Sequence, residues 1–306
     1  MQVDWKGVYP AITTKFNEDM SIDFDAFRAN LEKQIEAGIH GIVVAGTLGE
    51  ASTLTDEEKF ELVDAAREVS AGQLPVILNI AEGSTKKAVE MAQRAQERGA
   101  HGLMVLPPMM YKADDREVVA FFGAIAESMD LPILIYNNPV DYGIEVTMDM
   151  LEELAEYDNI QAIKESTRDL TNVTRIINRF GDRIKIMPGV DTIAIEALMM
   201  GADGWIAGIV AAFPEECVAI YELVKQERFE EARKLFRWFL PLCELDINPK
   251  LVQNIKLAEV ATELGTEQVR PPRLPLVGEE REYVQQVISK SLKNRPEIPE
   301  LSKVAG

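Results

Sequence analysis

Short apolar runs alternate with amphipathic helical patterns along most of the chain, and this alternation repeats eight times. Each apolar run has the length and composition of a buried strand, and each is followed by a stretch with helical periodicity. The predicted strands are GVYPAITTKF from Gly7, GIVVAG from Gly41, PVILNI from Pro75, GLMVLPP from Gly102, PILIYNNP from Pro132, IQAIKES from Ile160, IKIMPGV from Ile184 and GWIAGI from Gly204. Strands that alternate with helices in this way predict a parallel sheet built from βα units.

The number and the spacing of these units indicate how the sheet is arranged. The units have the length of one strand with its helix, and eight of them fit a closed (β/α)8 barrel, an α/β fold, better than an open sheet. Glycine stands between helix and strand in AGIHG, RGAHG and MGADG, as a helix C-cap requires. A doubly wound fold is the alternative, but no glycine-rich dinucleotide fingerprint follows the first strand.

The pattern beyond Phe213 is helical only. We therefore predict a barrel domain over residues 1–228 and a helical region over residues 229–306. The predicted helices here are FPEECVAIYELVKQERF, EEARKLFRWFLPLCEL, PKLVQNIKLAEVATELG and EEREYVQQVISKSL. The tail from Asn294 to Gly306 contains two prolines and few apolar residues, so we expect it to be loosely held.

Composition narrows the range of partners. The net charge of -19 argues against nucleic acid and anionic membranes, because both require a basic surface. No apolar run is long enough to span a bilayer and the first residues do not resemble a signal peptide, so we expect a cytoplasmic protein. Cys217 and Cys243 offer neither a metal-ligand spacing nor a disulfide framework. We expect no metal and no organic cofactor.

Lys164 is the residue that the hydrophobic pattern does not explain. On a strand it shares one face with Ile160, Ala162 and Ser166, so a cation stands among small and apolar residues. A buried, unpaired ammonium is costly, and losing its proton leaves a neutral amine that can attack a carbonyl. The alternative is a lysine that reaches solvent from the strand end or pairs with a carboxylate such as Glu165.

Two more polar features follow the ends of predicted strands, where barrels of this type bind their ligands. The turn from Gly46 to Glu50 reads GTLGE, and its free amide N–H groups could hold a carboxylate, although an ordinary turn looks the same. Tyr136 ends the fifth strand, next to the strand of Lys164, although a core tyrosine is the simpler interpretation. Both histidines, His40 and His101, precede strands and are predicted to lie at the opposite end. The conjunction of amine, turn and phenol favours an active site.

These motifs together resemble the dihydrodipicolinate synthase and N-acetylneuraminate lyase family over essentially the whole chain. The resembling motifs are GTLGE, YNNP and IKES, each on the expected strand. The resemblance implies that Lys164 forms an imine with a 2-oxo acid, that Tyr136 shuttles protons, and that Thr47 links to Tyr136. It also implies that the amides of Thr47 and Leu48 hold the substrate carboxylate and that the protein is a homotetramer. The other substrate-binding positions that it implies are Gly189, Ile206, Asp141 and Tyr111.

Several positions depart from the family pattern. Asp141 stands where the synthases have an arginine for the carboxylate of their second substrate, so a second anionic substrate is disfavoured there. Asp56 replaces the histidine of lysine-regulated synthases. Thr192 follows Asp191, where the lyases have an acidic residue. Tyr111 is a shifted candidate for the tyrosine that neighbouring subunits donate, and Met109 or Met110 are the alternatives for its place.

Within the family, the chain is most similar to the 1-pyrroline-4-hydroxy-2-carboxylate deaminases of hydroxyproline degradation. The supporting stretches are DWKGVYPAITTKFN, YNNP, LVQNIKL and RPPRLPLVGEEREYV. The resemblance implies a reaction with dehydration and hydrolytic release of ammonia, giving 2,5-dioxopentanoate. The alternatives are 4-hydroxy-tetrahydrodipicolinate synthase, a 2-keto-3-deoxy sugar acid aldolase or dehydratase and, in a different class, a catalytically silent barrel that binds an oxo acid.

Overall fold

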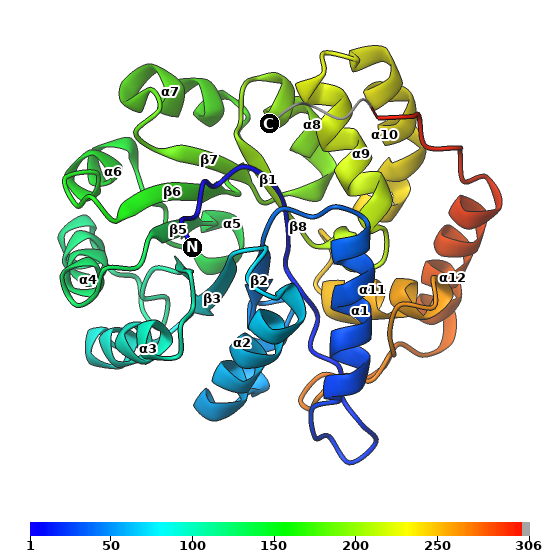
Figure 1. Ribbon diagram of the computed structural model, residues 1–306, viewed down its shortest axis with the longest axis horizontal. Coiled ribbons are helices and arrows are strands. Elements are labelled where there is room, and N and C mark those ends of the chain that lie inside the picture. Colours follow the sequence, from blue (N-terminus) through cyan, green and yellow to red (C-terminus); the bar gives the residue numbers. More distant parts are fainter. Residues whose placement is uncertain (302–306) are drawn as a thin grey trace.

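A computed structural model describes residues 1–301 and shows eight parallel strands arranged in a ring within this part of the chain (Figure 1). Neighbouring strands pair in parallel from β2 to β7, and β1 pairs with β8. A bridge between Ala11 and Val43 joins β1 to β2, and the Asp203 N–H donates to the Ile186 carbonyl between β7 and β8. The predicted (β/α)8 barrel is therefore confirmed. The strands are β1 Gly7–Pro10, β2 Ile42–Val44, β3 Val76–Ile80, β4 Gly102–Val105, β5 Ile133–Asn137, β6 Ile160–Glu165, β7 Lys185–Pro188 and β8 Gly204–Ala207.

Helices surround the ring of strands on the outside (Figure 1). Several of them begin at a side chain that accepts a backbone N–H, which satisfies one of the unpaired donors of the first turn. Thr55 and Asp114 form complete capping boxes with Glu58 and Glu117. The surrounding helices are α1 Phe24–Glu36, α2 Asp56–Ser70, α3 Thr85–Glu97, α4 Asp115–Glu127, α6 Met148–Leu154, α7 Thr171–Phe180, α8 Ala194–Met199 and α9 Pro214–Lys225, and a short α5 spans Pro139–Tyr142.

The barrel strands read as continuous apolar runs because both of their faces are buried, one in the barrel interior and one under the helices. The two histidines lie at the N-terminal ends of strands. His40 Nδ1 accepts a hydrogen bond from the Val8 N–H at 3.2 Å, and His101 Nδ1 accepts one from the Val76 N–H at 3.0 Å. Both side chains satisfy backbone groups at the end of the barrel that faces away from the carboxyl ends of the strands.

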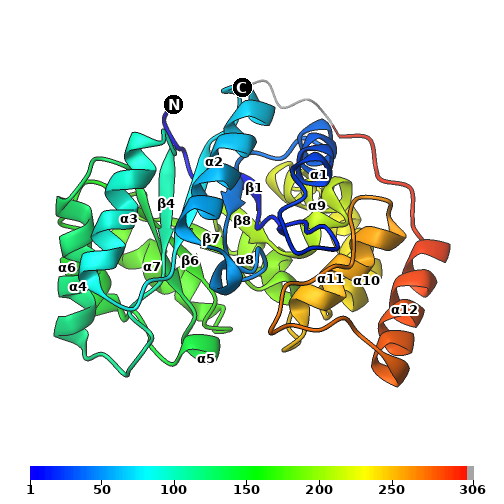
Figure 2. The ribbon, with the colours of Figure 1, turned by 90° about the horizontal axis from the view of Figure 1, so that it is seen from below.

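Three further helices follow α9 and pack beside the barrel: α10 Phe229–Cys243, α11 Leu251–Ala261 and α12 Gly278–Lys293. Figures 1 and 2 show α12 farthest from the barrel. Two buried ion pairs join α11 to the barrel, Lys15 with Glu259 at 2.9 Å and Glu50 with Lys256 at 2.6 Å. The division into domains after residue 228 stays a prediction.

The segment after α12 is held more firmly than its composition suggests. Arg295 contacts the carboxylates of Glu215 and Glu216, and Arg228 Nη1 donates to the Glu300 carbonyl at 2.7 Å. Leu301 packs against the core. The prediction of a loosely held tail is therefore wrong for residues 295–301. The partners of these residues lie far away in sequence, so the composition of the tail alone could not reveal the contacts. Residues 302–306 of that prediction lie outside the described part of the chain.

Cys217 and Cys243 are both free and buried, so they pack as small apolar side chains. Among the described residues, no helix combines the length and the apolar character that crossing a membrane requires.

Candidate active site at the barrel mouth

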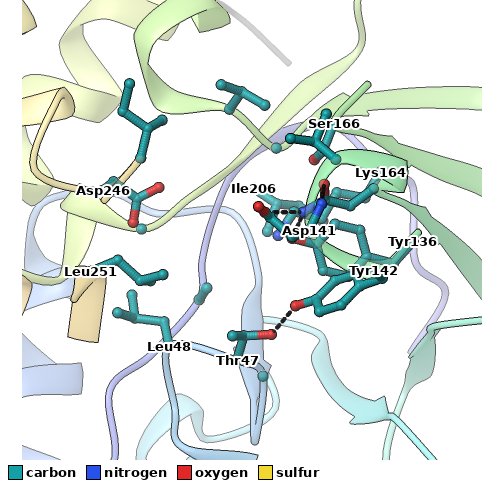
Figure 3. Close-up of a pocket in the computed structure, with 18 of the residues that line it drawn as sticks. Thr47, Leu48, Tyr136, Asp141, Tyr142, Lys164, Ser166, Ile206, Asp246 and Leu251 are labelled. Carbon is teal, nitrogen blue, oxygen red and sulfur yellow. Dashed lines mark hydrogen bonds between the residues drawn. The ribbon is translucent and has the colours of Figure 1, made fainter. Parts of the chain in front are cut away.

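A cavity of about 470 Å³ opens at the carboxyl ends of the strands (Figure 3). Its walls come from the ends of β2, β5, β6, β7 and β8 and from the connection between α10 and α11. The lining residues that carry the chemistry discussed below are Gly46, Thr47, Leu48, Tyr136, Asn138, Asp141, Tyr142, Lys164, Ser166, Arg168, Gly189, Ile206, Gly208 and Asp246. Predicted site residues from strands far apart in sequence therefore meet in one cavity.

Lys164 stands on β6 directly opposite Tyr136 of β5 in the strand register. Only 7% of the lysine is exposed, and its Nζ lies 4.0 Å from the centroid of the Tyr136 ring. A Cβ added at Gly189 would overlap the Lys164 side chain at Cε. Glycine at the end of β7 therefore provides the room that the lysine needs to enter the cavity.

Carboxyl groups around the cavity act on the Lys164 amine through space and favour its charged form. No hydrogen bond or ion pair joins its Nζ to another residue in the described part of the chain. Burial lowers the pKa of Lys164 from its ordinary value near 10.5. Glu165, the alternative partner, instead accepts from the Thr167 N–H at 2.8 Å and lies near the Asn137 amide. The site therefore favours a neutral amine, the form that attacks carbonyl carbon.

The turn after β2 presents backbone donors to the cavity. Ala45 has a φ of 55°, which redirects the chain at the strand end. Within residues 1–301, no group accepts a hydrogen bond from the N–H of Thr47 or Leu48. Glu50 anchors the turn through its buried pair with Lys256 and by accepting the Arg270 N–H at 3.0 Å. The turn is thus fixed from behind, and its free donors suit a carboxylate.

Tyr136 is a neutral phenol in this site. It is 7% exposed, and burial raises its pKa to about 12. Its hydroxyl accepts a hydrogen bond from Asn138 Nδ2 at 3.3 Å. Asn138 also caps α5, because its side chain accepts the Asp141 N–H, and Pro139 occupies the first helical position. This local structure carries α5 across the barrel mouth directly after β5.

Tyr142, at the end of α5, contributes a second phenol that sequence reasoning missed. Its hydroxyl is 2.5 Å from Thr47 Oγ1, and either oxygen can be the donor. Its ring meets the Tyr136 ring edge to face, with centroids 5.7 Å apart at 83°. The resemblance linked Thr47 to Tyr136, whereas the structure joins Thr47 to Tyr142 (Figure 3). A helix of four residues is too short to give a periodic pattern in the sequence. The only signal for Tyr142 was its position shortly after the YNNP motif.

A mixed pair of charges lies at the entrance of the cavity. Arg168 Nη2 is 4.0 Å from Asp141 Oδ1, and both side chains are about half exposed. Asn138 Nδ2 holds the other carboxylate oxygen of Asp141 at 2.7 Å. Sequence reasoning considered Asp141 without Arg168, and so treated the entrance as purely acidic. Arg168 lies two residues after the IKES motif, just past the end of a strand. That position could have identified it as a residue at the barrel mouth.

Asp246 enters the cavity from the connection between α10 and α11, outside the barrel strands. Its side chain lies against Gly208 at the end of β8, where an added Cβ would overlap the carboxyl group. Burial raises the pKa of Asp246 well above its ordinary value, and the Asp191 carboxylate raises it further. No sequence pattern indicated this residue, because the loop that carries it approaches the cavity only in the folded chain.

The other predicted positions divide into two groups. Gly189 and Ile206 line the cavity together with Leu48. Tyr111 does not line it, and its side chain is 53% exposed in the loop after β4. Asp56, noted for its departure from the family pattern, pairs with Lys87 on the outer helices. In the described part of the chain, no three His, Cys, Asp or Glu side chains are gathered as a metal site would require.

Comparison with known proteins agrees with this geometry. A family model described as the dihydrodipicolinate synthetase family matches residues 4–291. The 4-hydroxy-tetrahydrodipicolinate synthase of Methanopyrus kandleri is 33% identical over 300 residues, covering 96% of this chain and 98% of that protein. The protein of the same name from Exiguobacterium sibiricum is 32% identical over 276 residues, covering 89% of this chain and 92% of its own.

Solved structures give the same result. The 4-hydroxy-tetrahydrodipicolinate synthase from Methylacidiphilum fumariolicum superposes with a TM-score of 0.90 at 30% identity, over 94% of this chain and 96% of that one. A dihydrodipicolinate synthase from Bacillus anthracis superposes with a TM-score of 0.90 at 29% identity, over 94% and 99% of the two chains.

Proposed function

The chain belongs to the dihydrodipicolinate synthetase family and is a class I Schiff-base lyase, and from this premise we propose that it condenses pyruvate with aspartate semialdehyde, as a 4-hydroxy-tetrahydrodipicolinate synthase. The observation that carries the proposal is the amine of Lys164, which is buried beside a phenol, has a lowered pKa and shares its cavity with a turn that has free amide donors. The similar proteins that bear the synthase name support this choice of reaction.

The first half of the reaction uses the inner part of the cavity. The carboxylate of pyruvate binds the amides of Thr47 and Leu48, which places its C2 carbonyl before Lys164. The amine adds to C2, and the carbinolamine loses water to form an iminium ion. Tyr136, which keeps its proton at neutral pH, donates to the departing oxygen. The iminium ion then acidifies C3, and the Tyr136 phenolate left by that donation takes one proton from C3, which gives the enamine nucleophile.

The second half uses the entrance of the cavity. Aspartate semialdehyde carries an ammonium and a carboxylate beside its aldehyde. Arg168 and Asp141 present a guanidinium and a carboxylate that are 4.0 Å apart, which matches both charges of such a zwitterion. The expectation that Asp141 disfavours a second anionic substrate therefore loses its basis, because Arg168 supplies the cation that position 141 lacks.

A second candidate is the deaminase reaction on 1-pyrroline-4-hydroxy-2-carboxylate. The observation that favours it is the pair of carboxyl groups in the cavity, Asp141 and Asp246, which suits a substrate with a single carboxylate and a hydroxyl group. Lys164 would add to C2 of the cyclic imine, and Tyr136 or a water that it holds would remove a proton from C3. The C4 hydroxyl would then leave, and hydrolysis would release ammonia and 2,5-dioxopentanoate.

The experiment that decides is a side-by-side assay of the purified chain with both substrate sets. We expect condensation of pyruvate with aspartate semialdehyde to exceed ammonia release from the hydroxypyrroline. Faster ammonia release would replace the synthase proposal with the deaminase. A 2-keto-3-deoxy sugar acid serves as a third substrate, and its faster cleavage would favour an aldolase. No turnover of any of the three would favour the silent barrel.

Assembly is a separate part of the proposal. We include the homotetramer that the resemblance implies, and light scattering of the purified chain tests it. A monomer or dimer at assay concentration would remove the tetramer and leave the chemistry of the single-chain cavity unchanged.

A further inference from the structure

Two carboxyl groups lie on the side of the barrel formed by β7 and β8, and their surroundings are opposite. Asp191 is fully buried and accepts hydrogen bonds from Trp205 Nε1 at 2.9 Å, the Ile209 N–H at 2.8 Å and the Gly208 N–H at 3.1 Å. The Asp246 carboxyl accepts no hydrogen bond and forms no ion pair within residues 1–301. One group is a satisfied structural acid, and the other is left without a partner.

Asp246 is partly buried at the cavity wall, and a carboxyl group in such a place that lacks a partner favours its protonated form or a ligand. Burial and the nearby Asp191 raise the pKa of Asp246 and so favour its neutral form, while Lys164 opposes the shift. Gly208 preserves the space that the carboxyl group occupies, since any larger side chain there would displace it. The fold therefore holds an acid with a raised pKa at a position where no described residue bonds to its carboxyl group.

The position of Asp246 defines which part of a substrate it meets. In Figure 3 it faces the cavity from the side opposite Tyr136 and Tyr142, with Ile206 drawn between it and Lys164. A 2-oxo acid joined to Lys164 at C2, with its carboxylate at Thr47, has its remaining carbons directed away from that turn. The two phenols therefore lie beside the imine carbon, and Asp246 lies on the opposite wall of the cavity.

We propose that Asp246 is the catalytic acid for the oxygen on C4, the carbon next to the nucleophilic C3. This inference rests on the proposed Schiff-base function, and it holds for both candidate reactions. In condensation, the C3–C4 bond forms, the carbonyl electron pair moves to the aldehyde oxygen, and that oxygen takes the proton of Asp246. In dehydration, the C4–O bond breaks after C3 has lost its proton, and the oxygen leaves with the Asp246 proton as water.

Asp246→Asn tests the inference, because the amide keeps the shape of the side chain and cannot deliver a proton. Exchange of the C3 hydrogens of pyruvate in D2O, followed by NMR, reports the steps before C4 is involved. We expect this exchange to stay within about twofold of wild type, while product formation falls about 10²- to 10³-fold. The melting temperature should stay equal or rise, because an unpartnered acid is removed.

Three outcomes would overturn the inference. Product formation within about threefold of wild type would show that Asp246 delivers no proton. An equal fall in exchange and product formation would place its action at the imine. Absence of exchange in the wild-type protein would defeat the proposed function itself, which distinguishes the two failures. Glu244→Gln, an exposed carboxylate in the same connection, is the matched control and should match wild type in both assays.

A second variant approaches the same carboxyl group from the barrel. Gly208→Ala places a methyl group where the Asp246 carboxyl lies and should also lower product formation more than exchange. In the Asp246→Ala background, Gly208→Ala should add less than a twofold effect, because the group that it displaces is gone. An equally large loss in both backgrounds would contradict the role of Asp246.

Discussion

Lys256 and Lys164 are both buried, but their surroundings are opposite. Lys256 of α11, which is fully buried, donates to Glu50 Oε1 and to the Gln268 carbonyl, both at 2.6 Å. Lys164 of β6 is 7% exposed and has the ring of Tyr136 as its close neighbour, with no acceptor among the described residues. One lysine fastens the C-terminal helices to the turn after β2, and the other faces a cavity.

The difference shows how surroundings decide the use of a side chain. Burial lowers the pKa of Lys256 to about 8, while Glu50 opposes that change by stabilising the charged form. Burial also lowers the pKa of Lys164, and the groups that oppose it there make no hydrogen bond to its amine. A paired cation maintains structure, whereas an unpaired amine is available for reaction. The predictions below test this contrast.

The largest effect is expected for Lys164→Met. The neutral side chain of similar length removes the nucleophile, so turnover should fall by at least about 10⁴-fold. The free energy of unfolding should stay the same or increase, because the protein no longer buries an unpaired amine. Steady-state kinetics and chemical denaturation of the same preparation measure both. A fall in stability above about 2 kcal/mol would mean that Lys164 has a structural partner.

Lys256→Met should produce the reverse pattern. Removing this lysine leaves the buried Glu50 with only the Arg273 guanidinium, 3.9 Å away, so the free energy of unfolding should decrease by about 3 kcal/mol. The double variant with Glu50→Gln should recover part of the loss, since the uncompensated charge is gone. Denaturant titration of the two variants provides the measurement. An unchanged stability in Lys256→Met would contradict the structural role assigned to the pair.

Tyr136→Phe should lower turnover about 10²-fold, because the ring still packs while the proton donor is lost. Imine formation with pyruvate should persist at a reduced rate, since Lys164 remains. Rapid-mixing measurement of imine formation separates the two steps. Near-full turnover in this variant would transfer the proton-donating role to another group, and Tyr142 is the nearest phenol.

The smallest effect concerns pH. The Lys164 amine reacts only when neutral, and its folded-state pKa is below 10.5. The rate of imine formation should therefore rise with pH, about tenfold per unit below that lowered pKa, and level off above it. Tyr136, with a pKa of about 12, keeps its proton over this range. A rate that rises tenfold per unit all the way to pH 10.5 would show that the Lys164 pKa is not lowered.

Much of the fold could be predicted because the barrel strands are buried on both faces, and such strands are continuous apolar runs. The first strand shows where the pattern fails. We predicted GVYPAITTKF, whereas β1 ends at Pro10. Beyond it, Thr13 and Lys15 bind Glu259 of α11, and Thr14 donates to the Gly49 carbonyl at 2.6 Å. These polar residues lie outside the hydrogen-bonded part of the strand and contact residues far away in sequence. A hydropathy pattern does not reveal such contacts.

The same distinction applies to the cavity. Lys164, Tyr136 and the GTLGE turn were predictable because each ends a recognisable strand. Tyr142, Arg168 and Asp246 were not, since each lies in a short helix or a loop whose course depends on the packed structure. Between Lys164 and Asp246 the chain forms β7, β8 and the helices α7 to α10, so no local sequence motif could contain both residues.

The most direct test of the central claim is borohydride reduction in the presence of pyruvate, followed by peptide mass spectrometry. We expect one covalent adduct per chain, on Lys164, and none on Lys256 or Lys15 in the same digest. The Lys164→Met variant should give no adduct. A label on another lysine, or unlabelled protein after reduction with pyruvate, would contradict the claim that an uncharged Lys164 amine performs the chemistry.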